Sequence, residues 1–105
     1  MKMIRAVLRP EAADKVADGL EAGGFIALTR IEVFGRGKQK GIQVGSVVYD
    51  NLPKTMIMMV LDDEKLDAAV KIIRDSAWTG NIGDGKIFVN TVEEAYTIRT
   101  GQRGL

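Results

Sequence analysis

The chain has 105 residues, of which 46% are hydrophobic and 28% are charged, and its formal net charge is +1. This balance predicts one globular domain and gives no overall sign of a nucleic-acid or membrane partner. Cysteine and histidine are both absent, which excludes disulfides, thiolate metal sites, Cys nucleophiles and His-based catalysis. The N-terminal MKMIRAVLRP lacks the apolar core of a signal peptide, and no apolar run is long enough to span a membrane. We therefore expect a cytoplasmic protein.

The first third of the chain predicts a strand, a helix and a second strand. Residues 1–8 form a short apolar stretch interrupted by cations, which is typical of a strand. Pro10 suits the first turn of a helix, the apolar residues after it recur at helical spacing, and Gly23 with Gly24 ends the helix. Residues 25–34 are rich in β-branched and aromatic side chains and predict the second strand.

The rest of the chain predicts a strand over 54–61, a helix over 66–77 and a strand over 86–92. The order β-α-β-β-α-β is that of a ferredoxin-like α+β fold, with a four-stranded antiparallel sheet and two helices on one face. Two helices cannot cover both faces, yet the 54–61 strand, KTMIMMVL, is apolar on both. We therefore expect another subunit to cover the open face.

Two glycine-rich loops are candidates for anion binding. The first, GRGKQKG at 35–41, combines backbone freedom with three cations and could direct N–H groups at phosphates, although a solvated hairpin loop explains it as well. In the second, residues 80–86 match the G-x-x-x-x-G-K part of a Walker A motif. Ile87 replaces its Ser or Thr and the loop runs from helix to strand, so we reject a P-loop NTPase. A plain turn explains these glycines too, but Lys86 beside them keeps an anion site open.

Several motifs together resemble the PII family of signal-transduction proteins. TGNIGDGKIFV at 79–89 and IRTG at 98–101 follow Thr29, GKQKG and LPK in matching order, over essentially the whole chain. The resemblance implies a single PII-like domain over 1–105, with a long loop over about 36–53, a phosphate loop over about 79–86 and a C-terminal loop over about 97–105. It further implies a regulator, not an enzyme, that is a homotrimer or a heteromer with a paralogous PII subunit. ATP or ADP would bind between subunits, and 2-oxoglutarate would bind with Mg²⁺.

Site residues follow from the resemblance by position. The nucleotide would contact Thr29, Gly37, Lys38, Gln39, Val60, Gly83, Asp84, Gly85, Lys86 and Arg99, with Arg99 reaching from the far side of the cleft. The 2-oxoglutarate site would comprise Gln39, Lys40, Gly41 and Lys54, and Gln39 would also ligate the Mg²⁺. Lys38 and Thr97 stand where many members have arginine, so we expect altered phosphate affinity because neither offers a bidentate fork.

The long loop is about four residues shorter than in the common nitrogen-regulatory members, and Val47 occupies the place of their uridylylated tyrosine. Tyr49 is out of register, so we expect no uridylylation. The short loop resembles the nitrogen-fixation branch, NifI, and specifically its shorter-loop first subunit. That branch implies control of nitrogenase by direct contact, relieved by 2-oxoglutarate with ATP. The contact segment would comprise Ile42, Gln43, Val44, Gly45, Ser46, Val47, Val48 and Tyr49.

Three other functions remain as alternatives. A general PII protein would regulate an ammonium transporter or a nitrogen-metabolism enzyme, against which the short loop argues. A slow ATPase would need a general base near the phosphates, and the chain has no histidine. An RNA-binding ferredoxin-like domain would need exposed aromatic side chains on its central strands, and the 54–61 strand has none.

Overall fold

The structure, a computed structural model, describes residues 1–37, 42–44, 47–49 and 51–105. Its strands and helices, in chain order, are β1 (Lys2–Leu8), the 3-10 helix η1 (Pro10–Ala12), α1 (Ala13–Ala22), β2 (Thr29–Gly35), β3 (Ile42–Val44), β4 (Val47–Tyr49), β5 (Leu52–Leu61), the 3-10 helix η2 (Asp63–Lys65), α2 (Leu66–Ala77) and β6 (Gly85–Thr91). None of the described helices is long and apolar enough to cross a membrane.

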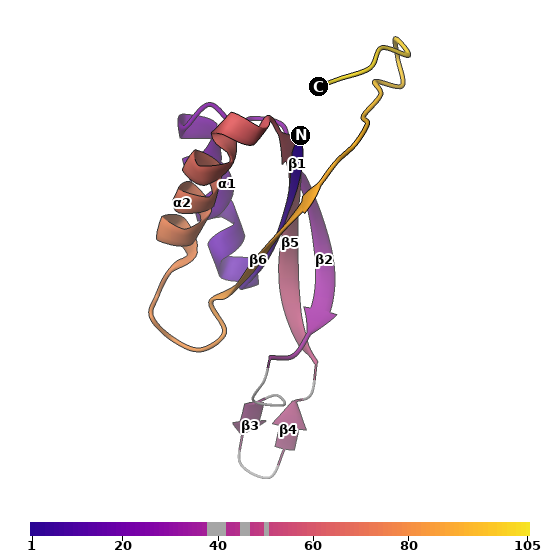
Figure 1. Cartoon of the computed structure of the whole chain (residues 1–105). Helices are drawn as coiled ribbons and strands as arrows, with labels where there is room; N and C mark the ends of the chain where they lie inside the picture. The colour runs from indigo at the N-terminus through magenta and orange to yellow at the C-terminus, as the bar shows by residue number, and fades with distance from the viewer. Residues whose placement is uncertain (38–41, 45–46, 50) are drawn as a thin grey trace.

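The main sheet has the strand order β2-β5-β1-β6, and every neighbouring pair is antiparallel. Both α-helices lie on one side of it (Figure 1). This confirms the predicted ferredoxin-like fold. The short strands β3 and β4 pair with each other as a separate hairpin, in which Ile42 is opposite Tyr49. No strands were predicted within this long loop.

The core lies between the sheet and the two helices. Residues on β5 alternate as predicted, because Thr55, Ile57, Met59 and Leu61 are buried while the residues between them are half-exposed. The other buried apolar side chains come from β1, α1 and α2, and the largest of them are Ile4, Leu8, Val16, Leu20 and Ile73. Each such side chain stabilises the fold by about 1.5–3 kcal/mol through its removal from water.

The other face of the sheet carries no helix (Figure 1). The strand register aligns Ile31, Met56 and Val7 across three neighbouring strands on this open face. Ile31 is exposed, and Met56 and Val7 are only partly buried. The apolar residues of β5 that the sequence assigned to a second face are thus left half-exposed in the single chain. Coverage of this face by another subunit stays a prediction.

The predicted second strand is wrong at its beginning. Residues 25–28 are not a strand, and β2 begins only at Thr29. The backbone N–H of Phe25 donates to the carbonyl of Leu20 at 2.8 Å, and Gly24 takes a φ of 90°. The backbone N–H of Phe25 is therefore used by the C-terminal turn of α1 and is not free to pair with a neighbouring strand. The third and fourth strands differ from prediction only at their ends.

Candidate functional site

The loop over residues 79–86 lies at the end of the sheet where the long loop begins. It leads from α2 into β6, whose Gly85 is paired with Leu8 at the end of β1. At the same end Gly35, the last residue of β2, is paired with Leu52, the first of β5. The 79–86 loop and the base of the 36–53 loop therefore share one end of the sheet (Figure 1).

The Asp84 carboxylate holds the 79–86 loop together from inside. It accepts hydrogen bonds from the backbone N–H groups of Thr79 and Gly80, at 2.8 and 2.9 Å, and from the Thr79 hydroxyl. The Thr79 hydroxyl and these N–H groups, with Arg9, lower the pKa of Asp84 to about 2. The carboxylate is therefore ionised and already bonded, so any contact of Asp84 with a phosphate would have to come from its backbone.

Three glycines of this loop, Gly80, Gly83 and Gly85, adopt backbone conformations that side chains disfavour. Gly83 has a φ of +100° and Gly85 a φ of +116°. A Cβ at Gly85 would lie 1.9 Å from the carbonyl oxygen of Val7 on the neighbouring strand. The glycine is thus required where the loop joins the sheet, because the two backbones approach too closely for any side chain.

Arg9 contacts the same loop, although nothing in the sequence pointed to it. Its Nη2 donates to the carbonyl oxygen of Ile82 at 2.6 Å, and its Nε lies 3.5 Å from Asp84 Oδ1. Arg9 follows the end of β1 directly and precedes η1. Only the pairing of β1 with β6 brings it to the loop.

Lys54 links the base of the long loop to the 79–86 loop. It lies on β5, opposite Val33, and its Nζ donates to the carbonyl oxygen of Gly83 at 3.2 Å. A residue predicted for the 2-oxoglutarate site thus touches one predicted for the phosphate site. Gly37 lies two residues beyond the end of β2 and is exposed. Of the remaining predicted residues, Lys38, Gln39, Lys40, Gly41, Gly45 and Ser46 lie outside the described residues.

The structure does not bring Thr29, Val60 or Arg99 to this end of the sheet. Thr29 begins β2, and Val60, opposite Met3, is next to the last residue of β5. Thr29 is six residues from Gly35 along β2, and Val60 is eight residues from Leu52 along β5, so each lies about 20 Å or more from the site end. The predicted nucleotide residues therefore fall into two groups within one chain.

Arg99 belongs to a C-terminal turn beyond β6. This turn lies past the end of the sheet that is opposite the β3–β4 hairpin (Figure 1). The turn is closed by a bridge between Tyr96 and Arg103, and Arg103 forms an ion pair with Glu94 at 3.1 Å. The Arg103 guanidinium also lies over the Tyr96 ring, 5.6 Å from its centroid. Ile98 beside Arg99 is fully exposed. The turn thus has internal structure of its own, and it places residue 99 beyond the end of β6 that is opposite the chain's own 79–86 loop.

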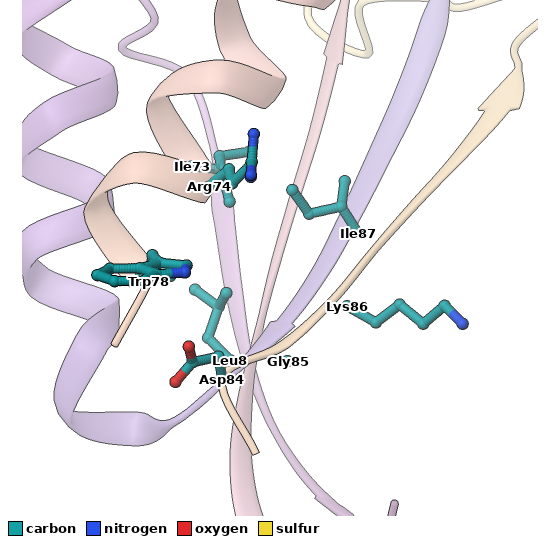
Figure 2. A pocket seen from close by; sticks show the side chains of 9 residues that line it. Leu8, Ile73, Arg74, Trp78, Asp84, Gly85, Lys86 and Ile87 are labelled. Atoms are coloured by element: carbon teal, nitrogen blue, oxygen red, sulfur yellow. The ribbon is translucent and has the colours of Figure 1, made fainter. Parts of the chain in front are cut away.

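A cavity of about 300 Å³ lies on the helix side of the sheet, between α2 and β6 (Figure 2). Its lining includes Ile73, Trp78 and Ile87, and Trp78 is 65% exposed. The Lys86 side chain extends away from this cavity (Figure 2). By register Lys86 is opposite Val7, on the open face. Lys86 is thus one of the residues that line the cavity, but its ammonium group lies toward the open face. Within the described ranges no group of three or more acidic, His or Cys side chains could hold a metal ion.

Comparison with known proteins identifies the family. The family model for nitrogen regulatory protein P-II matches residues 1–102. The chain is 63% identical over 105 residues to a protein named "Nitrogen fixation nifHD2 region GlnB-like protein 1" from Methanosarcina barkeri, with all of both chains covered. It is 55% identical, again over all of both chains, to "Nitrogen fixation nifHD region GlnB-like protein 1" from Methanothermobacter marburgensis. It is 47% identical to "Nitrogen regulatory protein P-II 2" from Methanothermobacter thermautotrophicus, over 99% of this chain and 94% of that one.

The two nitrogen-fixation relatives are both named "protein 1", which agrees with the predicted first subunit. The sequence identity is also higher to these two relatives than to "Nitrogen regulatory protein P-II 2". The predicted family and branch are thereby confirmed. The chain belongs to the P-II family of nitrogen regulatory proteins, in the branch that resembles the nitrogen-fixation region proteins.

Proposed function

We propose that this protein binds ATP or ADP and 2-oxoglutarate between the subunits of a trimer and controls nitrogenase by direct contact. The trimer would be formed by this chain alone or with a paralogous P-II subunit. The observation that carries the proposal is the 3.2 Å contact between Lys54 Nζ and the Gly83 carbonyl. This contact joins the base of the long loop to the glycine loop, so that one cation borders both predicted ligand sites.

The chemistry at this end of the sheet suits a polyphosphate. Gly83 and Gly85 carry no side chain of their own, and Lys54 on β5 and Lys86 on β6 supply positive charge from the two strands that flank β1. Uncovered N–H groups beside cations are the usual means by which proteins hold phosphate groups. The one carboxylate of the loop, Asp84, is bonded internally, which reduces its repulsion of a bound anion.

Lys54 supplies a route for coupling between the two ligands. Its ammonium has three donors, of which one contacts the Gly83 carbonyl. A 2-oxoglutarate carboxylate that binds the same ammonium would change the hydrogen bond between Lys54 and the Gly83 carbonyl. The affinities for nucleotide and 2-oxoglutarate would therefore depend on each other, and by equal factors.

Mg²⁺ would be held in part by the ligands themselves. The expected protein ligand, Gln39, lies outside the described residues. Its amide oxygen is a hard donor of the kind that Mg²⁺ prefers, and this ion is usually bound by few protein groups together with phosphates. The ion would supply charge neutralisation between the phosphates and the 2-oxoglutarate carboxylate.

The separation of the predicted nucleotide residues supports a site shared between subunits. Lys86 and Gly83 lie at one end of the sheet, whereas Thr29 lies about 20 Å away along β2 and Arg99 belongs to the C-terminal turn beyond β6. A second copy that covers the open face could bring its own Thr29, Val60 and Arg99 to the cleft. The half-exposed apolar row on that face gives a reason for the association.

Calorimetric titration with ATP and Mg²⁺, in the presence and absence of 2-oxoglutarate, tests the sensor proposal. We expect ATP to bind and 2-oxoglutarate to tighten its binding several-fold. ATP binding that is unaffected by 2-oxoglutarate would remove the sensing function and leave a nucleotide-binding protein. No binding of either ligand would refute the proposed site altogether.

The proposed target rests on the names of the relatives, which refer to a nitrogen-fixation region. The β3–β4 hairpin, with the residues between its strands, would form the contact. A nitrogenase assay with added protein, alone and with its paralogue, tests this directly. We expect inhibition that 2-oxoglutarate with ATP relieves. Capture of an ammonium transporter or a nitrogen-metabolism enzyme, with no effect on nitrogenase, would favour the general P-II function.

A further inference from the structure

We infer that Arg9 is a positioning residue for the phosphate site, which clamps the 79–86 loop in its binding conformation. The inference rests on the proposed nucleotide function and adds a residue that lies outside both glycine-rich loops. Arg9 stands between β1 and η1, and all its contacts to the loop are long-range in sequence.

The Arg9 guanidinium contacts three consecutive residues of the loop. Nη2 donates to the carbonyl oxygen of Ile82 at 2.6 Å, and Nε lies 3.5 Å from Asp84 Oδ1. Between them, a Cβ built on Gly83 would lie 3.0 Å from Nη2 and 3.3 Å from Cζ. The planar group therefore lies directly against the Gly83 backbone, at the centre of the loop.

These contacts set the direction of a backbone donor. The N–H and C=O of a trans peptide point in opposite directions. Because Arg9 holds the Ile82 carbonyl, the N–H of Gly83 points to the side away from Arg9. Lys54 holds the next carbonyl, that of Gly83. Two cations thus fix two successive peptide planes of a loop whose glycines would otherwise leave them free to rotate.

Arg9 also offsets the negative charge of the loop. Asp84 is the single acidic residue between positions 79 and 86. Its carboxylate is held inward by Thr79 and Gly80, and Arg9 is the cation that faces it. Without Arg9 this uncompensated carboxylate would lie beside the place where phosphates are proposed to bind. Loss of Arg9 should therefore weaken polyphosphate binding more than binding of the uncharged nucleoside.

The test compares ATP with adenosine in the full-length protein and uses the intrinsic fluorescence of Trp78. Trp78 is the only tryptophan, and a Cβ on Gly80 of the loop would lie 3.1 Å from its ring. Its emission therefore reports on the loop. The variants are Arg9→Met and Arg9→Lys. The control is Lys71→Met, which removes one cation from an exposed ion pair with Asp75 on α2.

We expect Arg9→Met to weaken ATP binding at least about tenfold, since it removes hydrogen bonds from a charged donor. Adenosine affinity should not change, and Trp78 emission should shift in the ligand-free protein. Arg9→Lys keeps the charge but not the two-nitrogen contact, and should lose about threefold. Lys71→Met should leave all three measurements as in the unmodified chain.

Unchanged ATP affinity and Trp78 emission in Arg9→Met would overturn the inference, as would an equal loss of ATP and adenosine affinity. If Arg9→Met does not fold, the same comparison in Arg9→Lys decides. If the unmodified protein binds no ATP, the proposed function fails. The ligand-free Trp78 emission of the two Arg9 variants then decides separately whether Arg9 holds the loop.

Discussion

The carboxylate of Asp84 accepts a 2.8 Å hydrogen bond from the backbone N–H of Thr79, and the Thr79 hydroxyl donates to the same carboxylate. These two residues close the turn that carries the chain from α2 into β6. The carboxylate thereby replaces the backbone hydrogen bonds that a short glycine-rich turn lacks. The conformation of the proposed phosphate loop therefore depends on an ionised Asp84.

The first prediction concerns pH. The Thr79 hydrogen bonds, together with smaller contributions from Gly80 and Arg9, lower the pKa of Asp84 from the ordinary value of 3.8 to about 2. Because the folded-state value is depressed, the stabilisation by this carboxylate is fully present above about pH 4. It is lost as pH falls through about 2. An NMR titration of the Asp84 carboxyl carbon should show this low midpoint, and Thr79→Val should move the midpoint upward. A midpoint near 3.8 in the unmodified protein would contradict the role assigned to Thr79.

The second prediction concerns stability. Gly85→Ala should lower the free energy of unfolding by at least about 3 kcal/mol, because positive φ is strained for alanine and the new methyl group clashes with backbone. That methyl group would lie 1.9 Å from the Val7 carbonyl oxygen. Urea denaturation measures the change.

Gly24→Ala is the matched control for Gly85→Ala. Gly24 also has positive φ, +90°, but a Cβ there meets nothing within 4 Å. This variant should lose only about 1 kcal/mol, from backbone strain alone. Equal losses in the two variants would mean that the β1–β6 approach at Gly85 relaxes readily.

The third prediction concerns the open face of the sheet. Met56→Asp places a carboxylate between Ile31 and Val7 on that face. If a second copy covers the face, the charge would be buried without a partner, and the proposed trimer should dissociate. Sedimentation velocity measures the assembly state. Ala68→Asp on the exposed surface of α2 is the control and should keep the assembly state of the unmodified chain. A trimer that tolerates Met56→Asp would place the interface elsewhere.

The fourth prediction tests whether the nucleotide site is shared between subunits. Lys86→Ala and Arg99→Ala should each weaken ATP binding, because each removes a cation from the cleft. When the two variants are mixed and refolded together, some clefts should combine an intact Lys86 with the intact Arg99 of a neighbouring copy. Calorimetry should then show tight sites reappear in the mixture. No recovery would mean that both residues act within one chain or that one of them is not in the site.

Much of the fold follows from local patterns. The continuous apolar run over 56–61 predicted a strand with two apolar faces, and the alternating burial of Ile57, Met59 and Leu61 confirms the strand and its buried face. The strand period is a property of neighbouring residues, so it can be read without knowledge of the partners. The two helices and the β-α-β-β-α-β order were predictable for the same reason. Residues 25–28 were mistaken for a strand because the end of α1 competes for their hydrogen bonds.

The sequence by itself determined the element order, the apolar second face of the sheet and, through its motifs, the residues of the glycine loops. Only the tertiary structure decided what holds the 79–86 loop. Arg9 and Ile82 are 73 residues apart, and Lys54 and Gly83 are 29 apart. Both contacts exist because antiparallel pairing brings the end of β1, the start of β5 and the start of β6 to the same end of the sheet. No local pattern encodes such contacts, since they depend on which strands become neighbours.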